Sequence, residues 1–163
     1  MKTYKYILSV AAAATLACVS YAQTAELSHA DRAFLEKAAK AGNKEVAISE
    51  AVQPNLTTPS TKEFAQMIAS DHAKANEELR TLAASKGVVL PPPDAKLTQK
   101  WSKNDKDADE DYIKEMVSEH KDAVELFEKA AKSKDADIAA FAEKTLPTLR
   151  QHLEKAEAEK KAH

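Results

Sequence analysis

The sequence predicts an all-α protein, a ferritin-like four-helix bundle with one long crossover between its second and third helices. Three observations carry this prediction. The chain of 163 residues contains only two glycines and is rich in Ala, Glu and Lys, which favours helix. Four stretches repeat apolar residues at the helical period. A proline-containing connection of about 20 residues separates the second stretch from the third, whereas adjacent antiparallel helices usually need about two to eight.

Residues 1–22 have the pattern of a bacterial signal peptide. Lys2 and Lys5 precede an apolar run at 6–19, and small residues lead to a cleavage site after Ala22. The run is shorter than the roughly 20 residues that cross a bilayer, so a permanent membrane anchor is the weaker interpretation. We expect no transmembrane segment in the mature chain. We therefore predict a periplasmic or extracellular protein. The alternative is a lipoprotein anchored at Cys18, since Leu16-Ala17-Cys18 partly matches a lipobox.

The mature chain, residues 23–163, is predicted to form a single domain. It contains no cysteine, and loss of the two lysines in the leader takes its net charge from −2 to −4. A mildly acidic chain without a basic patch is a poor nucleic-acid binder, so we predict no nucleic-acid partner. An exported bundle is compatible with a protein partner in the cell envelope, whose identity the sequence does not give.

The first helix is expected at about 28–53, with Ser28 as its N-cap. One face carries Phe34, Ala38, Ala41, Glu45, Ile48 and Val52. The second is expected at about 59–86, with a capping box formed by Ser60 and Glu63. Its buried face carries Phe64, Ile68, His72, Ala75, Leu79 and Leu82. Glu45 and His72 are therefore polar members of apolar stripes.

The connection at 87–106 begins with an extended segment that contains three prolines. Fully extended, about 20 residues reach roughly 60 Å, enough to return along a 27-residue helix of about 40 Å. A crossover therefore fits, and simple up-down-up-down topology is the alternative.

The third and fourth helices are expected at about 107–133 and 135–160. The stripe of the third contains Ile113, Met116, Val117, His120, Val124, Phe127 and Ala131. That of the fourth contains Ile138, Phe141, Thr145, Leu149, His152 and Ala156. Pro147 is expected to kink the fourth helix.

Glu45, His72, His120 and His152 are the candidate metal ligands. With a crossover, counting residues from the helix ends places them within roughly 8 Å of one another along the bundle axis. Three imidazoles and a carboxylate suit a transition metal ion such as Zn, Cu or Fe, and Met116 is a candidate additional ligand for copper. The competing interpretation is structural: each histidine is a hydrogen-bonded core residue, and Glu45 forms a buried ion pair.

Motifs in all four helices resemble one bacterial family. They are Glu45-Val46, Phe64-Ala65-x-Met67-Ile68-x-x-Asp71-His72, Tyr112-Ile113-x-x-Met116-Val117-x-x-His120 and Leu146-Pro147-x-Leu149-x-x-His152. In this order and spacing they resemble the exported family called domain of unknown function four-one-four-two, often labelled membrane or outer-membrane proteins. The resemblance covers about residues 28–156 and implies a ferritin-like bundle without a settled activity. The chain departs from it at Ala108-Asp109, where the family usually has an aromatic before the acidic residue, so looser packing is expected there.

The sequence thus favours an exported helical bundle that binds a transition metal through core residues. The alternative is a non-catalytic envelope or stress-related protein that binds a partner without metal. A ferritin-like redox enzyme ranks last, because the Glu-x-x-His motifs of di-iron bundles are absent: Ala69, Val117 and Leu149 stand three residues before the three histidines. No catalytic residues are predicted.

Overall fold

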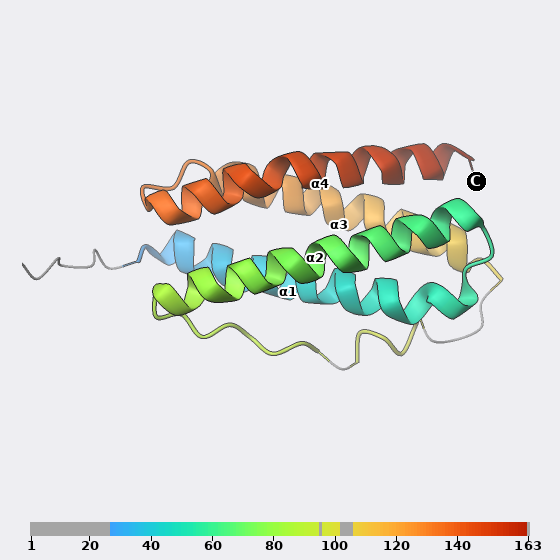
Figure 1. The fold of residues 1–163 in the computed structure, drawn as a ribbon, viewed down its shortest axis with the longest axis horizontal. Coiled ribbons are helices and arrows are strands. Elements are labelled where there is room, and N and C mark those ends of the chain that lie inside the picture. The colour runs from blue at the N-terminus through green and yellow to red at the C-terminus, as the bar shows by residue number, and fades with distance from the viewer. Residues whose placement is uncertain (1–26, 95, 102–105, 163) are drawn as a thin grey trace, which may run out of the picture.

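The computed structural model describes residues 27–94, 96–101 and 106–162, so the predicted signal peptide and Cys18 lie outside the described residues. The described part consists of helices and their connections (Figure 1). The helices are α1 (His29–Val52), a short 3₁₀ helix η1 (Gln53–Asn55), α2 (Pro59–Ser85), α3 (Ala108–Ala130) and α4 (Ala136–Ala162). No helix in these ranges is both long and apolar enough to cross a membrane.

The four long helices form a bundle with the crossover topology. α1 and α4 run in one direction, and α2 and α3 run in the other (Figure 1). α1 packs mainly on α2 and α3 mainly on α4, while smaller contacts join α1 to α3 and α2 to α4. Every packed pair is therefore antiparallel, and the parallel helices α2 and α3 lie diagonally. The predicted ferritin-like bundle with a crossover is confirmed, and the up-down-up-down alternative is wrong.

The two predicted N-caps have different outcomes. Ser28 caps α1: its hydroxyl oxygen accepts a hydrogen bond of 3.1 Å from the backbone amide three residues on. The capping box of Ser60 is wrong, because Thr58 is the N-cap residue of α2 and Pro59 occupies the first helical position. The fixed φ of proline suits that position. Ser60 instead donates a hydrogen bond of 2.9 Å to Glu159 of α4.

α3 ends three residues before the predicted position, at Ala130. The cause is the tight link to α4. The hydroxyl of Ser133 donates to Asp31 at 2.6 Å and accepts from the backbone amide of Asp135 at 3.0 Å. Ser133 therefore belongs to the turn, where its side chain binds α1. α4 contains Pro147 in its interior, so this proline does not end the helix, and the predicted kink stays a prediction.

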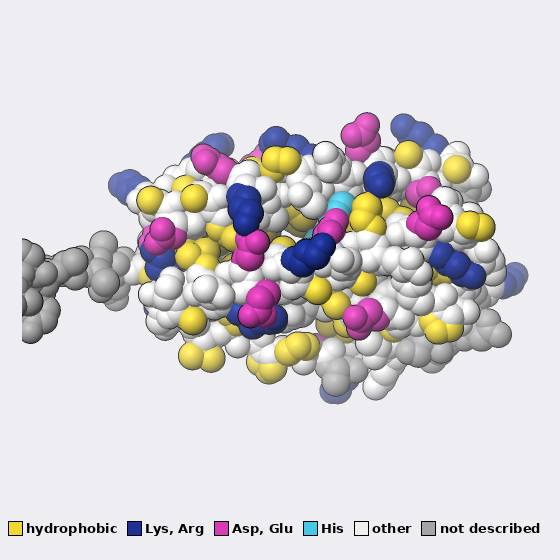
Figure 2. Space-filling view, viewed as in Figure 1, with side chains coloured by type: hydrophobic (Ala, Val, Ile, Leu, Met, Phe, Trp, Pro, Cys, Tyr) yellow, Lys and Arg dark blue, Asp and Glu magenta, His cyan; other side chains and the backbone are white. Residues whose placement is uncertain are grey.

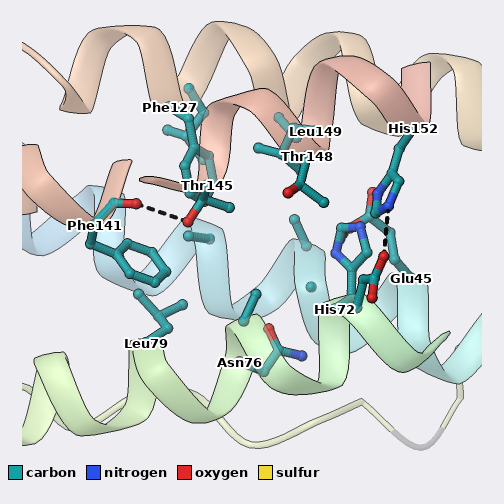
Figure 3. Close-up of a pocket in the computed structure, with 17 residues that line it drawn as sticks. Glu45, His72, Asn76, Leu79, Phe127, Phe141, Thr145, Thr148, Leu149 and His152 are labelled. Carbon is teal, nitrogen blue, oxygen red and sulfur yellow. Dashed lines mark hydrogen bonds and ion pairs between the residues drawn. The ribbon is translucent and has the colours of Figure 1, made fainter. Parts of the chain in front are cut away.

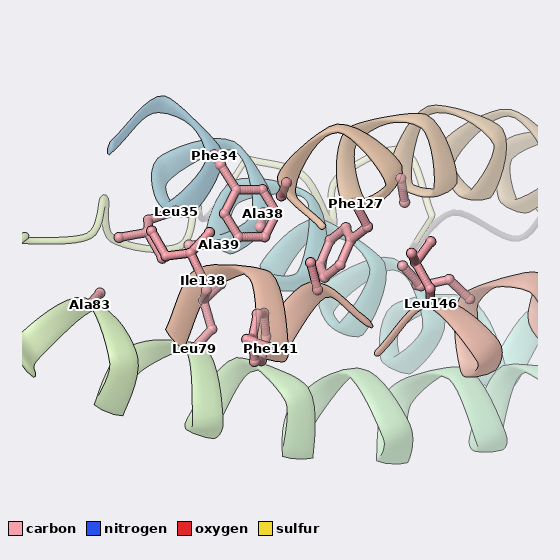
Figure 4. Close-up of a cluster of buried hydrophobic side chains, with 14 of the residues drawn as sticks. Phe34, Leu35, Ala38, Ala39, Leu79, Ala83, Phe127, Ile138, Phe141 and Leu146 are labelled. Carbon is pink, nitrogen blue, oxygen red and sulfur yellow. The ribbon is translucent and has the colours of Figure 1, made fainter. Parts of the chain in front are cut away.

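The core consists of two apolar clusters on either side of a polar layer. The first lies at the end where α1 begins, with the rings of Phe34 and Phe127 in edge contact at 5.1 Å (Figure 4). The second lies at the other end and includes Ile48, Phe64, Tyr112 and Met116. Between the two clusters lies a polar layer to which each helix contributes one residue: Glu45, His72, His120 and His152. This interruption of the apolar core is the main feature of the fold.

The start of α3 is firmly held, contrary to the looser packing expected at Ala108-Asp109. Asp109 is 7% exposed, and its carboxylate accepts bonds of 2.9 Å from the backbone amides of Thr57 and Thr58 and from the Thr57 hydroxyl. Burial acts to raise the pKa of Asp109, but these hydrogen bonds outweigh it and lower the pKa. Trp101 is buried against Tyr112, their ring centroids 6.2 Å apart. An aromatic residue from the connection therefore covers the helix start.

We expect Asp109→Ala to lower the free energy of unfolding by about 2–4 kcal/mol. The change removes three hydrogen bonds to a charged acceptor and leaves amide donors of the α1–α2 connection without their partner. Glu110→Ala is the control, because Glu110 is an exposed carboxylate in the same helical turn and should cost less than about 0.5 kcal/mol. Urea denaturation measures both, and equal effects would contradict this role of Asp109.

Candidate metal centre

The structure brings together the four polar residues that were predicted to share a layer. Glu45 of α1, His72 of α2, His120 of α3 and His152 of α4 are 1%, 6%, 0% and 2% exposed. Each helix contributes one side chain, because each residue replaces an aliphatic one on the buried stripe. The crossover brings these positions to one depth, since it sets α3 antiparallel to α1 and α4 antiparallel to α2.

One nitrogen of each histidine ring points to a common centre. His72 Nε2 lies 3.3 Å from His120 Nε2, and His120 Nε2 lies 3.4 Å from His152 Nδ1. Ring atoms of the three histidines that can serve as metal ligands all lie within 4.8 Å of one another. The centre is therefore small enough for one ion to contact three nitrogens.

The other nitrogen of each ring faces an oxygen acceptor. His72 Nδ1 lies 2.8 Å from Glu45 Oε2, His120 Nδ1 lies 2.9 Å from the backbone oxygen of Met116, and His152 Nε2 lies 3.2 Å from Asp71 Oδ2. Each of these nitrogens must carry the proton, because a carbonyl or carboxylate oxygen accepts. In the neutral rings the three inward nitrogens then present lone pairs to one another.

Glu45 and Met116 thus lie differently from the three histidines. The Glu45 carboxylate lies behind the rings, with Oε2 on His72 Nδ1 and Oε1 3.5 Å from His120 Nδ1. This is how carboxylates commonly orient metal-binding histidines. The Met116 side chain is buried in the second apolar cluster, and its backbone oxygen contacts His120. The geometry supports both as residues that orient the rings.

Asp71 belongs to the site although helix periodicity does not select it. It lies one position before His72 and therefore off the buried stripe, with its side chain 35% exposed. From α2 it reaches across to His152 of α4. The available signal in the sequence was an acidic residue next to a core histidine, since such pairs on neighbouring helices can share one layer.

Burial controls the protonation of the centre. Loss of hydration lowers the pKa of His120, opposed by the charge of Glu45, and lowers the pKa of His152 to about 4, opposed by Asp71. For Glu45, burial acts to raise the pKa, but the interactions with the three histidines together outweigh it and lower the pKa. The centre therefore combines an ionised carboxylate with imidazoles that resist protonation, His120 and His152.

These donors fit a transition metal ion. Imidazole nitrogens bind Zn²⁺ at about 2.0–2.1 Å, and the edge of a tetrahedron of that size is about 3.3 Å. Two of the three nitrogen separations, 3.3 and 3.4 Å, match this edge. The third is at most 4.8 Å, so the rings would have to move closer together on that side to hold one ion. An ion at the centre would also relieve the repulsion between the facing lone pairs.

We expect the metal-free protein to lose stability as the pH falls from about 6.5 to about 4.5. His120 and His152 have lowered pKa values in the folded state, so the unfolded chain binds more protons in this range and unfolding becomes easier. The expected loss is about 1–3 kcal/mol, measured by urea denaturation with chelator present. Glu45 and Asp109 act in the same direction but at lower pH, because their pKa values are lowered from ordinary values near 4.

The matched control for this pH dependence is His152→Gln, which removes one titrating ring and should flatten the profile. A free energy of unfolding that stays constant or rises between pH 6.5 and 4.5 in the unsubstituted protein would contradict the buried, neutral state of these rings.

Comparison with known proteins places this chain. No curated protein matches it. A solved structure described as "Crystal structure of DUF305 fragment from Deinococcus radiodurans" superposes with a TM-score of 0.70 at 10% identity, covering 81% of this chain and 95% of that one. At this identity the likeness shows the fold alone. The family model described as Domain of unknown function (DUF4142) matches residues 16–158. The chain therefore belongs to the DUF4142 family, as the motifs in its four helices indicated.

Proposed function

We propose that this protein binds one divalent transition metal ion in the middle of its bundle, with His72, His120 and His152 as the ligands. The observation that carries the proposal is that the outer nitrogen of each ring faces an oxygen acceptor, from Glu45, the Met116 backbone or Asp71. Each acceptor fixes the proton on the far nitrogen of a ring and leaves the near nitrogen free to donate its lone pair. A histidine with a purely structural role needs only one such hydrogen bond. Such a role does not explain why the unprotonated nitrogens of three histidines point to one another.

The donor set narrows the class of metal. Three imidazoles without thiolate favour borderline ions such as Zn²⁺, Cu²⁺ or Fe²⁺ over Mg²⁺ or Ca²⁺, which prefer oxygen. Glu45 supplies one negative charge beside the centre, which offsets part of the charge of the ion. The proposed role is binding and handling of the ion.

We expect metal-free protein, purified without a histidine tag, to bind one Zn²⁺ or Cu²⁺ per chain and to melt at a higher temperature. An ion that binds only the folded state adds about 2.7 kcal/mol of stability at 100 times its Kd. Metal analysis and calorimetry with and without chelator measure both. A protein that takes up no stoichiometric metal, and whose melting temperature ignores zinc, copper and chelator, would rule the proposal out.

Three variants separate the roles of the residues. Glu45→Gln should weaken binding by about 10–100-fold while one ion still binds, since Glu45 orients His72. His120→Ala should weaken it more, because a ligand is lost. His29→Ala is the matched control: His29 is an exposed histidine of α1 outside the site, and its loss should change nothing. Circular dichroism of the metal-free variants distinguishes lost binding from lost folding.

We further propose that the protein works outside the cytoplasm, with cleavage after Ala22. The support is the basic start and apolar run of residues 1–22 together with a mature chain free of cysteine. Lipid attachment at Cys18 is the alternative location signal.

Expression in a Gram-negative host tests this export. We expect the protein in the periplasmic fraction, with the intact mass of a chain that begins at Gln23. Cys18→Ser should then leave processing unchanged. Accumulation of the precursor in that variant would instead indicate a lipoprotein, and full-length protein in the cytoplasm would contradict export.

A further inference from the structure

A small cavity borders the histidine centre on one side. Its volume is about 40 Å³, enough for about three water molecules. It is lined by residues of all four helices. His72 of α2 and His152 of α4 close one end, while Phe127, Phe141 and Leu79 lie toward the other (Figure 3). The surface view shows a histidine side chain in the crease between these two helices, next to acidic and basic side chains (Figure 2). The centre is therefore approached from this crease.

The cavity touches the histidines unequally. His72 and His152 line it, and His120 is fully buried behind them. A tetrahedral ion bound by three nitrogens has one position left, which in sites of this type holds water or another exchangeable ligand. The cavity supplies empty space on the side of the centre that His72 and His152 line.

Glu45 supplies a second, independent observation. Its Oε1 is a buried side-chain atom of the described residues that has no hydrogen-bond partner, and Glu45 lines the cavity. A buried carboxylate oxygen without a donor is costly, and such an atom calls for an unseen partner. The cavity has room for one, so we expect a water molecule beside Glu45, where it can donate a hydrogen bond to Oε1.

The remaining walls limit what else can enter. They are mostly small or apolar, with Ala75, Leu79 and Leu149 among them, and Thr148 lies one turn before His152. The Thr145 hydroxyl already donates to the backbone oxygen of Phe141 at 2.8 Å. Such walls accept a ligand of a few atoms and exclude larger organic molecules or strongly hydrated ones.

We propose that the cavity is the binding site of a small exchangeable ligand of about two to four non-hydrogen atoms, which takes the fourth position on the ion. Water fills the site at rest, and a small molecule with a lone pair replaces it through the crease between α2 and α4. This inference rests on the proposed metal function and deepens it: the centre is open, with three protein ligands, and differs from a closed structural site with four.

The test uses cobalt(II) as the metal and azide as the ligand, because the visible spectrum of cobalt reports its coordination. Metal analysis first establishes one cobalt per chain. Azide should then change the spectrum in a saturable way. Thr148→Leu, which adds volume to the cavity wall, should keep the cobalt but weaken the azide response by at least about tenfold, since the added atoms fill the space that azide needs.

Two further variants serve as controls for this experiment. Thr148→Val keeps the volume of the side chain and should leave the azide response in place, so it controls for loss of the hydroxyl. Ala75→Leu narrows the cavity from α2 and replaces Thr148→Leu if that variant does not fold.

The outcomes separate this inference from the proposed function. One cobalt per chain with no azide response means that a protein group fills the fourth position, which overturns the inference and leaves the metal site standing. A response that survives both cavity-filling variants places the ligand elsewhere and also overturns the inference. Failure to bind cobalt, zinc or copper overturns the metal function itself, and this inference with it.

Discussion

The polar layer of the bundle is organised around the bond between Glu45 and His72, a carboxylate and an imidazole 2.8 Å apart in an apolar interior. Burying an ionised carboxylate costs several kcal/mol unless charged or hydrogen-bonding groups surround it. Only one oxygen of Glu45 is satisfied in this way, so the pair is a poor means of stabilising a fold. Glu45 lies behind the His72 ring, which points at the rings of His120 and His152. The pair is therefore better explained as part of a binding site than as part of the core.

The sequence predicts the fold well because the bundle follows from periodicity and chain length. Four apolar stripes set the helices, and the long connection sets their directions. The same reasoning brought Glu45, His72, His120 and His152 to one layer, since a residue on a stripe points inward whatever its chemistry. It failed at Ser60, where the proline before it starts the helix earlier and frees the serine side chain to reach α4.

The details of the centre lie beyond periodicity. A stripe identifies the buried face of a helix, but it cannot tell which atom of a residue points to a partner. Glu45 therefore looked equivalent to the histidines, and Met116 looked like a source of sulfur, although its backbone oxygen makes the contact with His120. Asp71 lies off the stripe and joins the site only because α4 passes close to the edge of α2. Such a contact depends on how two helices are rotated against each other, which one sequence does not contain.

The three histidines of the centre come from two different helical hairpins. α1 and α2 form one hairpin, and α3 and α4 form the other. His72 comes from the first hairpin, while His120 and His152 come from the second. An ion held by all three would therefore tie the two hairpins together across the bundle, much as a disulfide would, in a chain whose single cysteine, Cys18, lies before the first helix. Unlike a disulfide, this tie would form and break with the supply of the ion and would contain no sulfur–sulfur bond that a reductant could cleave.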